Sequence, residues 1–91
     1  MAETVYMAPE RVDRYSASQV QEELDKLMDG GAKELVFDMA DMKYISSAGL
    51  RVLLATQQRL GSDGSLVLAN VPEVVMEVLR STGFESFMKI R

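Results

Sequence analysis

The chain of 91 residues is 47% apolar and 26% charged, a composition typical of one small globular domain, which we expect residues 1–91 to form. It contains no cysteine and no histidine, which excludes disulfides, cysteine-ligated metals, and the commonest general base and zinc ligand. The net charge of −4 argues against nucleic acid as a partner. The sequence shows no signal-like N-terminus and no apolar run of about 20 residues, so we expect a cytoplasmic protein without membrane contact.

The first expected elements are a short strand and an amphipathic helix. Residues 4–7 predict the strand. Apolar residues then recur at helical spacing, which predicts a helix over about 17–28. Ser16 or Ser18 is its expected N-cap, and the glycines at 30–31 are its expected stop. The apolar face of this helix consists of Val20, Leu24, Leu27 and Met28.

Two buried strands and two further helices follow along the chain. The continuous apolar run at 35–37 and the largely apolar segment 65–70 are typical of strands covered on both faces. Helical patterns occupy 48–60 and 72–81, and residues 85–91 predict a last edge strand. Alternating strands and helices indicate an α/β fold. We therefore expect a small mixed, largely parallel sheet with right-handed crossovers and helices packed on it.

The helix at 48–60 has a second partly apolar face opposite its core face. Small residues on this face would allow another backbone to approach closely, and an exposed apolar patch edged by charge is typical of a partner-binding surface. A neighbouring helix of the same domain would cover such a stripe equally well, so both interpretations stay open. The expected core face is Leu50, Leu53, Leu54 and Leu60, and the opposite face is Ala48, Arg51, Val52, Ala55 and Arg59, with Ser47 beside them.

Two adjacent serines, Ser46 and Ser47, precede this helix. A serine at this place is most often an N-cap, which contributes about 1 kcal/mol. One hydroxyl is enough for the cap, so the other is available for a second task. A phosphoryl group at a helix N-terminus is stabilised by the free N–H groups and the helix dipole. It would bring about −1.5 to −2 charges to the surface that a partner meets.

The stretch "DMADMKYISSAGLRVLLATQQRL", residues 38–60, resembles the signature of the STAS-domain anti-sigma factor antagonists. In that family a strand ending in an acidic residue leads through a short loop to a serine-rich turn and a helix. The resemblance extends to Asp13, which matches an early acidic position, and to Gly83-Phe84, which matches a "GF" after the third helix.

Aligned on Gly49-Leu50, the serine that this family phosphorylates falls on Ser47. Ser46 stands where many members carry aspartate, which makes it the expected cap or helper. Asp38 and Asp41 match the acidic positions before the loop. Two such carboxylates could in principle hold Mg²⁺, but at a strand end and in a loop they are more often caps.

The resemblance implies a regulator rather than an enzyme. The unphosphorylated protein is expected to bind an anti-sigma factor that is also a serine kinase, so that the sigma factor is freed. Phosphorylation of Ser47 would then break the complex, and a PP2C-type phosphatase would reset it. No cofactor is expected for the chain itself. The residues expected to contact the partner are Ser46, Ala48, Gly49, Arg51, Val52, Ala55 and Asp41.

A docking or scaffold module without phosphorylation switching is the alternative, because STAS domains also occur in larger assemblies. The chain also departs from the family pattern at both ends. Too few residues precede Asp13 for the customary opening hairpin, so we expect one strand there. The customary C-terminal helix is absent as well, and we therefore expect a STAS-like domain trimmed at both termini.

Overall fold

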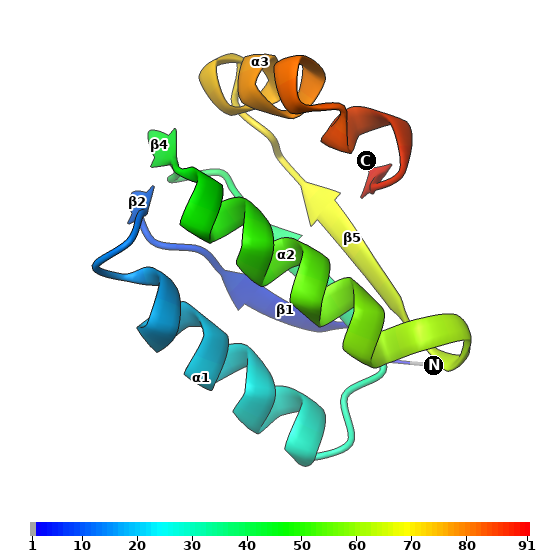
Figure 1. Cartoon of the computed structure of the whole chain (residues 1–91). Coiled ribbons are helices and arrows are strands. Elements are labelled where there is room, and N and C mark those ends of the chain that lie inside the picture. The colour runs from blue at the N-terminus through cyan, green and yellow to red at the C-terminus, as the bar shows by residue number, and fades with distance from the viewer. Residues whose placement is uncertain (1) are drawn as a thin grey trace.

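Three α-helices and six strands make up residues 2–91, which are the residues described by the computed structural model (Figure 1). The strands are β1 (Thr4–Met7), β2 (Arg11–Val12), β3 (Glu34–Asp38), β4 (Tyr44–Ile45), β5 (Ser65–Ala69) and β6 (Lys89–Ile90). The helices are α1 (Ala17–Asp29), α2 (Ser47–Leu60) and α3 (Glu73–Thr82), with short 3-10 turns at Gly61–Asp63 and Phe84–Ser86.

The main sheet has the strand order β1-β3-β5-β6, and each of its pairings is parallel. This arrangement confirms the predicted α/β fold with a largely parallel sheet. Leu35, Val36 and Phe37 of β3 are each at most 2% exposed, as expected for an interior strand. The prediction of only one strand before Asp13 is wrong, because β2 follows β1 there; the two do not form a hairpin, since β1 pairs with β3 at the edge of this sheet and β2 pairs with β4.

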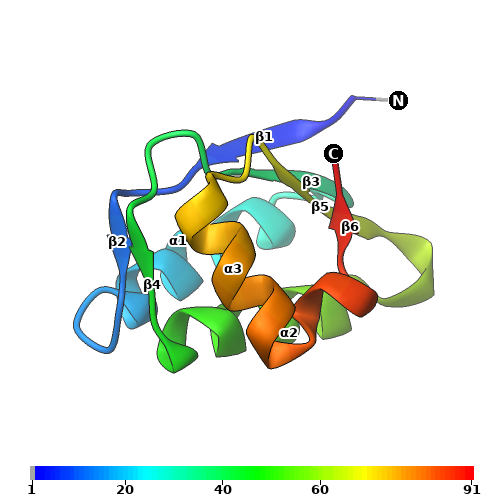
Figure 2. The same ribbon diagram turned by 90° about the horizontal axis from the view of Figure 1, so that it is seen from above.

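One face of the sheet carries the hydrophobic core. Helices α1 and α2 lie side by side against this face, and α3 crosses the end of the sheet (Figures 1 and 2). Leu24 of α1, Leu53 of α2 and Leu68 of β5 are completely buried in the core. Each such leucine contributes about 1.5–3 kcal/mol through burial, so these contacts fix α2 on the sheet.

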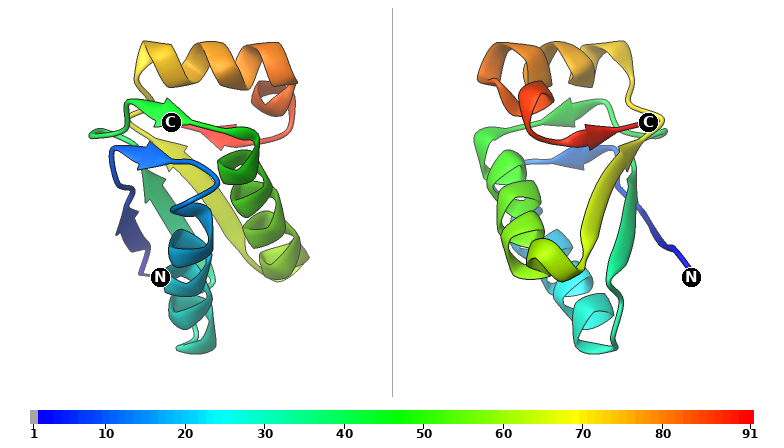
Figure 3. Two further views of the ribbon diagram at one scale, coloured as in Figure 1. Left: turned by 60° about the vertical axis from the view of Figure 1, so that its left-hand side comes forward. Right: turned by 90° about the vertical axis from the view of Figure 1, so that its right-hand side faces the viewer.

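The second sheet consists only of β2 and β4, and the sequence did not reveal it. These two-residue strands pair in parallel, with Arg11 opposite Tyr44 and Val12 opposite Ile45. Figure 3 shows the pair lying between α3 and the first turns of α1 and α2. Because β2 leads into α1 and β4 leads into α2, this short ladder fixes where both helices begin.

The ends of the predicted elements differ from the observed ones by a few residues. Pro72 is the N-cap of α3, and Gly83 ends that helix in the left-handed conformation, with φ 82°. The expected strand at 85–91 is shortened to β6 because the chain first makes the 3-10 turn after Gly83.

Within residues 2–91 no α-helix combines the length and apolarity needed to cross a bilayer.

Candidate docking site around Ser47

The two serines before α2 have different environments. Ser46 is the N-cap, and its Oγ accepts hydrogen bonds from the backbone N–H groups of Ala48 at 3.2 Å and Gly49 at 3.4 Å. The predicted cap or helper role of Ser46 is therefore confirmed as a cap. Ser47 is the first residue of α2 and is exposed. Its hydroxyl makes no hydrogen bond with any residue in the described range 2–91.

Gly49 allows the first turn of α2 to sit directly on the β2–β4 ladder. A Cβ atom at this position would lie 2.6 Å from Ile45 Cγ1 and 2.8 Å from the Val12 carbonyl oxygen. No side chain fits at such distances without moving backbone. The glycine of the "SSAGL" turn is thus required by close packing and not by its φ angle.

The outer face of α2 is narrower than the helical wheel predicts. Arg51 and Ala55 are exposed and Ala48 is half-buried, as expected for a docking face. The prediction is wrong for Val52, which is 6% exposed and belongs to the core cluster, and Gly49 is buried as well. The reason is that α2 packs against three elements, α1, β5 and β4. It is therefore buried over more of its circumference than the predicted division into one core face and one opposite face allows.

The core face of α2 also differs in composition from the prediction. Leu50 and Leu53 are buried as expected, whereas Leu54 is only half-buried and lies outside the core cluster. Thr56 is fully buried instead, and its hydroxyl donates a 2.8 Å hydrogen bond to the Val52 carbonyl oxygen. Because that bond satisfies the hydroxyl within the helix, a threonine can occupy a core position that the sequence pattern would assign to an apolar residue.

Ser47 borders a surface depression of about 370 Å³, here called the Ser47 depression. Its wall combines the start of α2 with the loop that connects β2 to α1. The lining residues are Arg11, Asp13, Arg14, Tyr15, Tyr44, Ser46, Ser47, Ala48 and Arg51. Of these, Ser46, Ser47, Ala48 and Arg51 were expected at the site, and the others were not.

Short-range hydrogen bonds hold the loop from β2 to α1 in place. The Asp13 carboxylate accepts the backbone N–H groups of Tyr15 at 2.9 Å and Ser16 at 3.2 Å. The Ser16 hydroxyl accepts the Asp13 N–H and donates to the Arg11 carbonyl oxygen, both at 3.0 Å. Ser16 therefore occupies the predicted N-cap position of α1 while its side chain stabilises the preceding loop.

Arginine side chains dominate the charge of the Ser47 depression. Arg11 lies over the Tyr44 ring, 4.6 Å from its centroid, and its Nε is 3.5 Å from an Asp13 carboxylate oxygen. Backbone hydrogen bonds from Tyr15, together with those from Ser16 and the nearby Arg11 charge, lower the pKa of Asp13. Three guanidinium groups against one carboxylate leave this depression with a formal charge of +2 on a chain whose net charge is −4.

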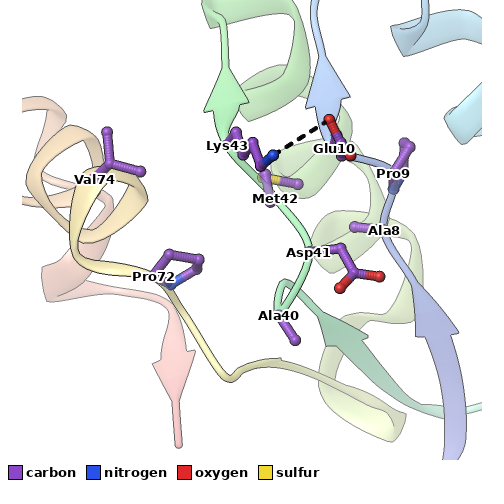
Figure 4. A pocket seen from close by; sticks show the side chains of 9 residues that line it. All are labelled: Ala8, Pro9, Glu10, Ala40, Asp41, Met42, Lys43, Pro72 and Val74. Atoms are coloured by element: carbon purple, nitrogen blue, oxygen red, sulfur yellow. Dashed lines mark ion pairs between the residues drawn. The ribbon is translucent and has the colours of Figure 1, made fainter.

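Asp41 lies in a neighbouring depression of about 540 Å³, here called the Asp41 depression (Figure 4). The structure therefore does not bring Asp41 and Ser47 into the same hollow. Lys43 Nζ is 3.9 Å from a Glu10 carboxylate oxygen at its edge. The residues lining it are Ala8, Pro9, Glu10, Ala40, Asp41, Met42, Lys43, Pro72 and Val74.

The Asp38 carboxylate is already occupied by local hydrogen bonds. It accepts the Ala40 backbone N–H at 3.0 Å and the Asn70 side-chain amide at 3.2 Å. These contacts match a capping role at the end of β3. Within the described part of the chain, no three histidine, cysteine, aspartate or glutamate side chains come together as metal ligands would.

Arg11, Arg14 and Tyr15 are the site residues that sequence reasoning missed. They lie far from Ser47 in the chain and reach it only through the β2–β4 pairing. The available signal was the position of Asp13, since the matched acidic residue marks the loop that carries its neighbours. Tyr44, which lies two residues before Ser46 in the chain, is 44% exposed and also lines the Ser47 depression.

The sequence is similar to a known protein family over almost its whole length. The family model described as "STAS domain" matches residues 2–91. A protein of Bordetella bronchiseptica named "Putative anti-sigma factor antagonist BtrV" is 38% identical over 80 residues, which covers 87% of this chain and 69% of that protein. The chain belongs to the STAS domain family, as the resemblance implied.

Solved structures confirm the fold. An anti-sigma factor antagonist from Mycobacterium paratuberculosis superposes with a TM-score of 0.88 at 18% identity, covering 97% of this chain and 75% of that one. The anti-sigma factor antagonist SpoIIAA in its unphosphorylated form gives a TM-score of 0.81 at 16% identity, covering 98% and 79%. Family membership and the name of the 38% identical relative support the prediction that the chain is a regulatory binding protein and not an enzyme.

Proposed function

We propose that this protein is an anti-sigma factor antagonist whose partner binding is switched by phosphorylation of Ser47. The unphosphorylated chain binds an anti-sigma factor that is also a serine kinase, and this binding frees the sigma factor. Phosphorylation of Ser47 releases the chain, and a PP2C-type phosphatase restores it. The name of its 38% identical relative supports the general role, and the switch rests on the structure around Ser47.

The division of labour between the two serines is the observation that carries this proposal. Ser46 alone caps α2, so Ser47 is not needed to hold the helix. The Ser47 side chain is exposed at the rim of an open depression. A kinase can therefore reach this hydroxyl without unfolding any part of the domain, and the modified protein keeps its fold.

The chemistry of the switch is a phosphoryl transfer. Ser47 Oγ attacks the γ-phosphorus of Mg²⁺-bound ATP, the bond from that phosphorus to the bridging oxygen breaks, and ADP leaves. The hydroxyl proton passes to a base of the kinase. A PP2C-type phosphatase returns the serine by delivering water to phosphorus, and inorganic phosphate is released.

The docking surface in this proposal runs along α2 and across the β2–β4 ladder. Ser47, Arg51 and Ala55 follow one another at helical spacing and are exposed. The Asp41 depression lies at the start of the β2–β4 ladder, since its lining residues Glu10 and Lys43 directly precede the paired residues Arg11 and Tyr44. A phosphoserine in the middle of such a surface adds about two negative charges where the partner binds. If this costs about 3–4 kcal/mol of binding free energy, the affinity falls by two to three orders of magnitude.

The first test is intact-mass measurement after incubation with ATP and an anti-sigma kinase encoded beside this chain. We expect a gain of one phosphate on the natural chain and on Ser46→Ala, and no gain on Ser47→Ala. Phosphate on Ser47→Ala would place the modification elsewhere. A chain that gains no phosphate while it still binds the kinase would instead be a docking or scaffold module.

The second test measures binding to the same kinase by calorimetry. Ser47→Asp adds one negative charge at the switch position and is expected to weaken binding at least tenfold, about 1.4 kcal/mol. Ser47→Asn has nearly the same shape without the charge and serves as the matched control. Equal affinities of the two variants would show that charge at this position does not control the complex.

A further inference from the structure

Two arginines at the Ser47 depression have no carboxylate partner among residues 2–91. Arg11, Arg59, Arg80 and Arg91 each lie within 4.0 Å of an aspartate or glutamate oxygen. Arg14 and Arg51 have no such partner in this described range, and both line the Ser47 depression. The unpaired arginines of an acidic chain are therefore gathered beside the one hydroxyl proposed to be modified.

Both side chains also retain hydrogen-bond capacity. The only hydrogen bond of the Arg14 guanidinium within the described chain goes from Nη2 to the Tyr15 hydroxyl, at 2.6 Å. Its Cζ atom lies 4.8 Å from the centroid of the same ring, which holds the group at the edge of the depression. A guanidinium has five N–H donors in a planar fork, so most donors of Arg14 remain available for an anion.

Arg51 approaches Ser47 from the helix itself. The two residues are four positions apart on α2 and therefore lie next to each other on its exposed face. The formal charge of +2 in this depression matches the charge of a phosphoserine, about −1.5 to −2. Arg11 is less available because it is already held by Asp13 and Tyr44.

We propose that a phosphoryl group on Ser47 is bound in cis by the guanidinium groups of Arg14 and Arg51. This inference rests on the proposed modification of Ser47 and adds how the modified state is held. Bidentate guanidinium–phosphate bonds are about twice as strong as neutral hydrogen bonds and fix geometry as well as charge. The phosphoserine then lies across the Ser47 depression and closes it.

This arrangement gives the switch a second component. In the unmodified protein the same two arginines are free to pair with carboxylates of a docked partner. The phosphate on Ser47 withdraws them, so the partner loses attraction in addition to meeting a new negative group. Release therefore follows from competition for Arg14 and Arg51 within one surface.

The test uses the full chain with phosphoserine installed at position 47 by total synthesis or by genetic encoding, so no kinase is required. A ³¹P NMR titration measures the second pKa of the phosphoserine, which is about 6 when free. Two nearby cations favour the dianion, so we expect this pKa to be at least about half a unit lower in the folded protein than in urea-unfolded chain. High salt is expected to reduce the difference only in part, because the donors contact the phosphate directly.

Arg14→Gln and Arg51→Gln, combined in one chain, are expected to raise the phosphoserine pKa most of the way to its value in urea, because the free N–H groups at the start of α2 still favour the dianion. Arg80→Gln removes the same charge from a residue that lines neither depression and is expected to leave the pKa unchanged. Circular dichroism checks that all variants fold. A phosphoserine pKa that is equal in the folded and unfolded chain, or that does not respond to the double substitution, would overturn the inference. That result would not affect the kinase experiment, which tests whether Ser47 is modified. A negative kinase experiment would likewise not affect the titration, which tests only how the two arginines bind the phosphate.

Discussion

Ser46 and Val12 are joined by a 2.9 Å hydrogen bond from the Ser46 backbone N–H to the Val12 carbonyl oxygen. This bond continues the parallel β2–β4 ladder, in which Val12 already pairs with Ile45. The cap of α2 is therefore tied to the segment that carries Arg11 and Arg14. The position of the Ser47 depression depends on this contact, so substitutions around it test how the site is built.

Gly49→Ala is expected to destabilise the domain. The new methyl group would meet Ile45 Cγ1 at 2.6 Å and the Val12 carbonyl oxygen at 2.8 Å, so α2 must move away from the ladder. Overpacking of this kind costs about 1–3 kcal/mol, which urea denaturation followed by circular dichroism measures as a lower midpoint.

Gly30→Ala is the matched control for this substitution. Gly30 has a φ of −79°, and the nearest neighbour of a Cβ atom at this position would be the Lys26 carbonyl oxygen at 3.4 Å. Alanine is accommodated there, and its smaller unfolded-state entropy makes the variant as stable as the natural chain or more so. Equal urea midpoints for Gly49→Ala and Gly30→Ala would contradict the proposed packing of α2 on the ladder.

Ser46→Ala and Ser47→Ala are expected to separate stability from switching. Ser46→Ala removes the acceptor for the Ala48 and Gly49 N–H groups and should cost about 1 kcal/mol in the free energy of unfolding. Ser47→Ala removes an exposed hydroxyl and should stay within about 0.5 kcal/mol of the natural chain. Thermal and urea unfolding measure both, and a larger loss for Ser47→Ala would mean that the two serines have been assigned the wrong roles.

The loop that carries Arg14 is expected to make the stability of the domain depend on acid pH. The folded-state pKa of Asp13 is lowered, chiefly because the Tyr15 N–H donates to its carboxylate. Below its unfolded pKa of about 3.9 the unfolded chain then binds more protons than the folded chain. The contribution of Asp13 is therefore fully present above that pKa and is lost as the pH falls through the lower folded value.

Asp13→Asn tests this assignment because asparagine keeps an acceptor oxygen for the Tyr15 and Ser16 N–H groups but has no titrating proton. Urea midpoints measured between about pH 2.5 and 6 should fall less steeply with acid in Asp13→Asn than in the natural chain. Asp63→Asn removes the same charge from an exposed residue of the turn after α2 and should keep the natural slope. Identical slopes for all three proteins would exclude Asp13 as a source of the acid dependence.

The main sheet and the three helices could be predicted because their residues carry a continuous pattern. Val36, with apolar neighbours on both sides, indicates an interior strand, and Val20 with Leu24 indicates a helix face. The β2–β4 ladder could not be predicted, because a strand of two residues has no periodicity of its own. Its pairing is a tertiary contact that neither segment specifies alone.

The candidate site was predictable in the part that lies on α2 and unpredictable in the part that lies on the loop after β2. Ser46 and Ser47 stand out in the sequence because they break an apolar run at a helix start. Arg14 has no comparable local signal, since an exposed arginine in a loop is usually only a solvated charge. Val52 was misplaced because the wheel shows directions on one helix and not how many neighbours surround it.

The exposed stripe of α2 allows a direct test of the proposed docking surface. Ala55→Arg places a long charged side chain two turns after Ser47 on the same exposed face, where nothing in the domain has to move to admit it. If a partner packs against the small residues of this stripe, its affinity for the unphosphorylated chain should fall at least tenfold, about 1.4 kcal/mol, as measured by calorimetry with the anti-sigma kinase.

Ser81→Arg is the matched control, because it adds the same side chain at an exposed position in the last turn of α3. It should leave the affinity unchanged, since a cation is favourable at a helix C-terminus and the residue lies on another helix. Both variants change the net charge equally. A loss of affinity that is confined to Ala55→Arg would therefore show that the partner binds on α2. Equal losses for both variants would show that the effect is long-range electrostatic and that the docking surface does not lie on this helix.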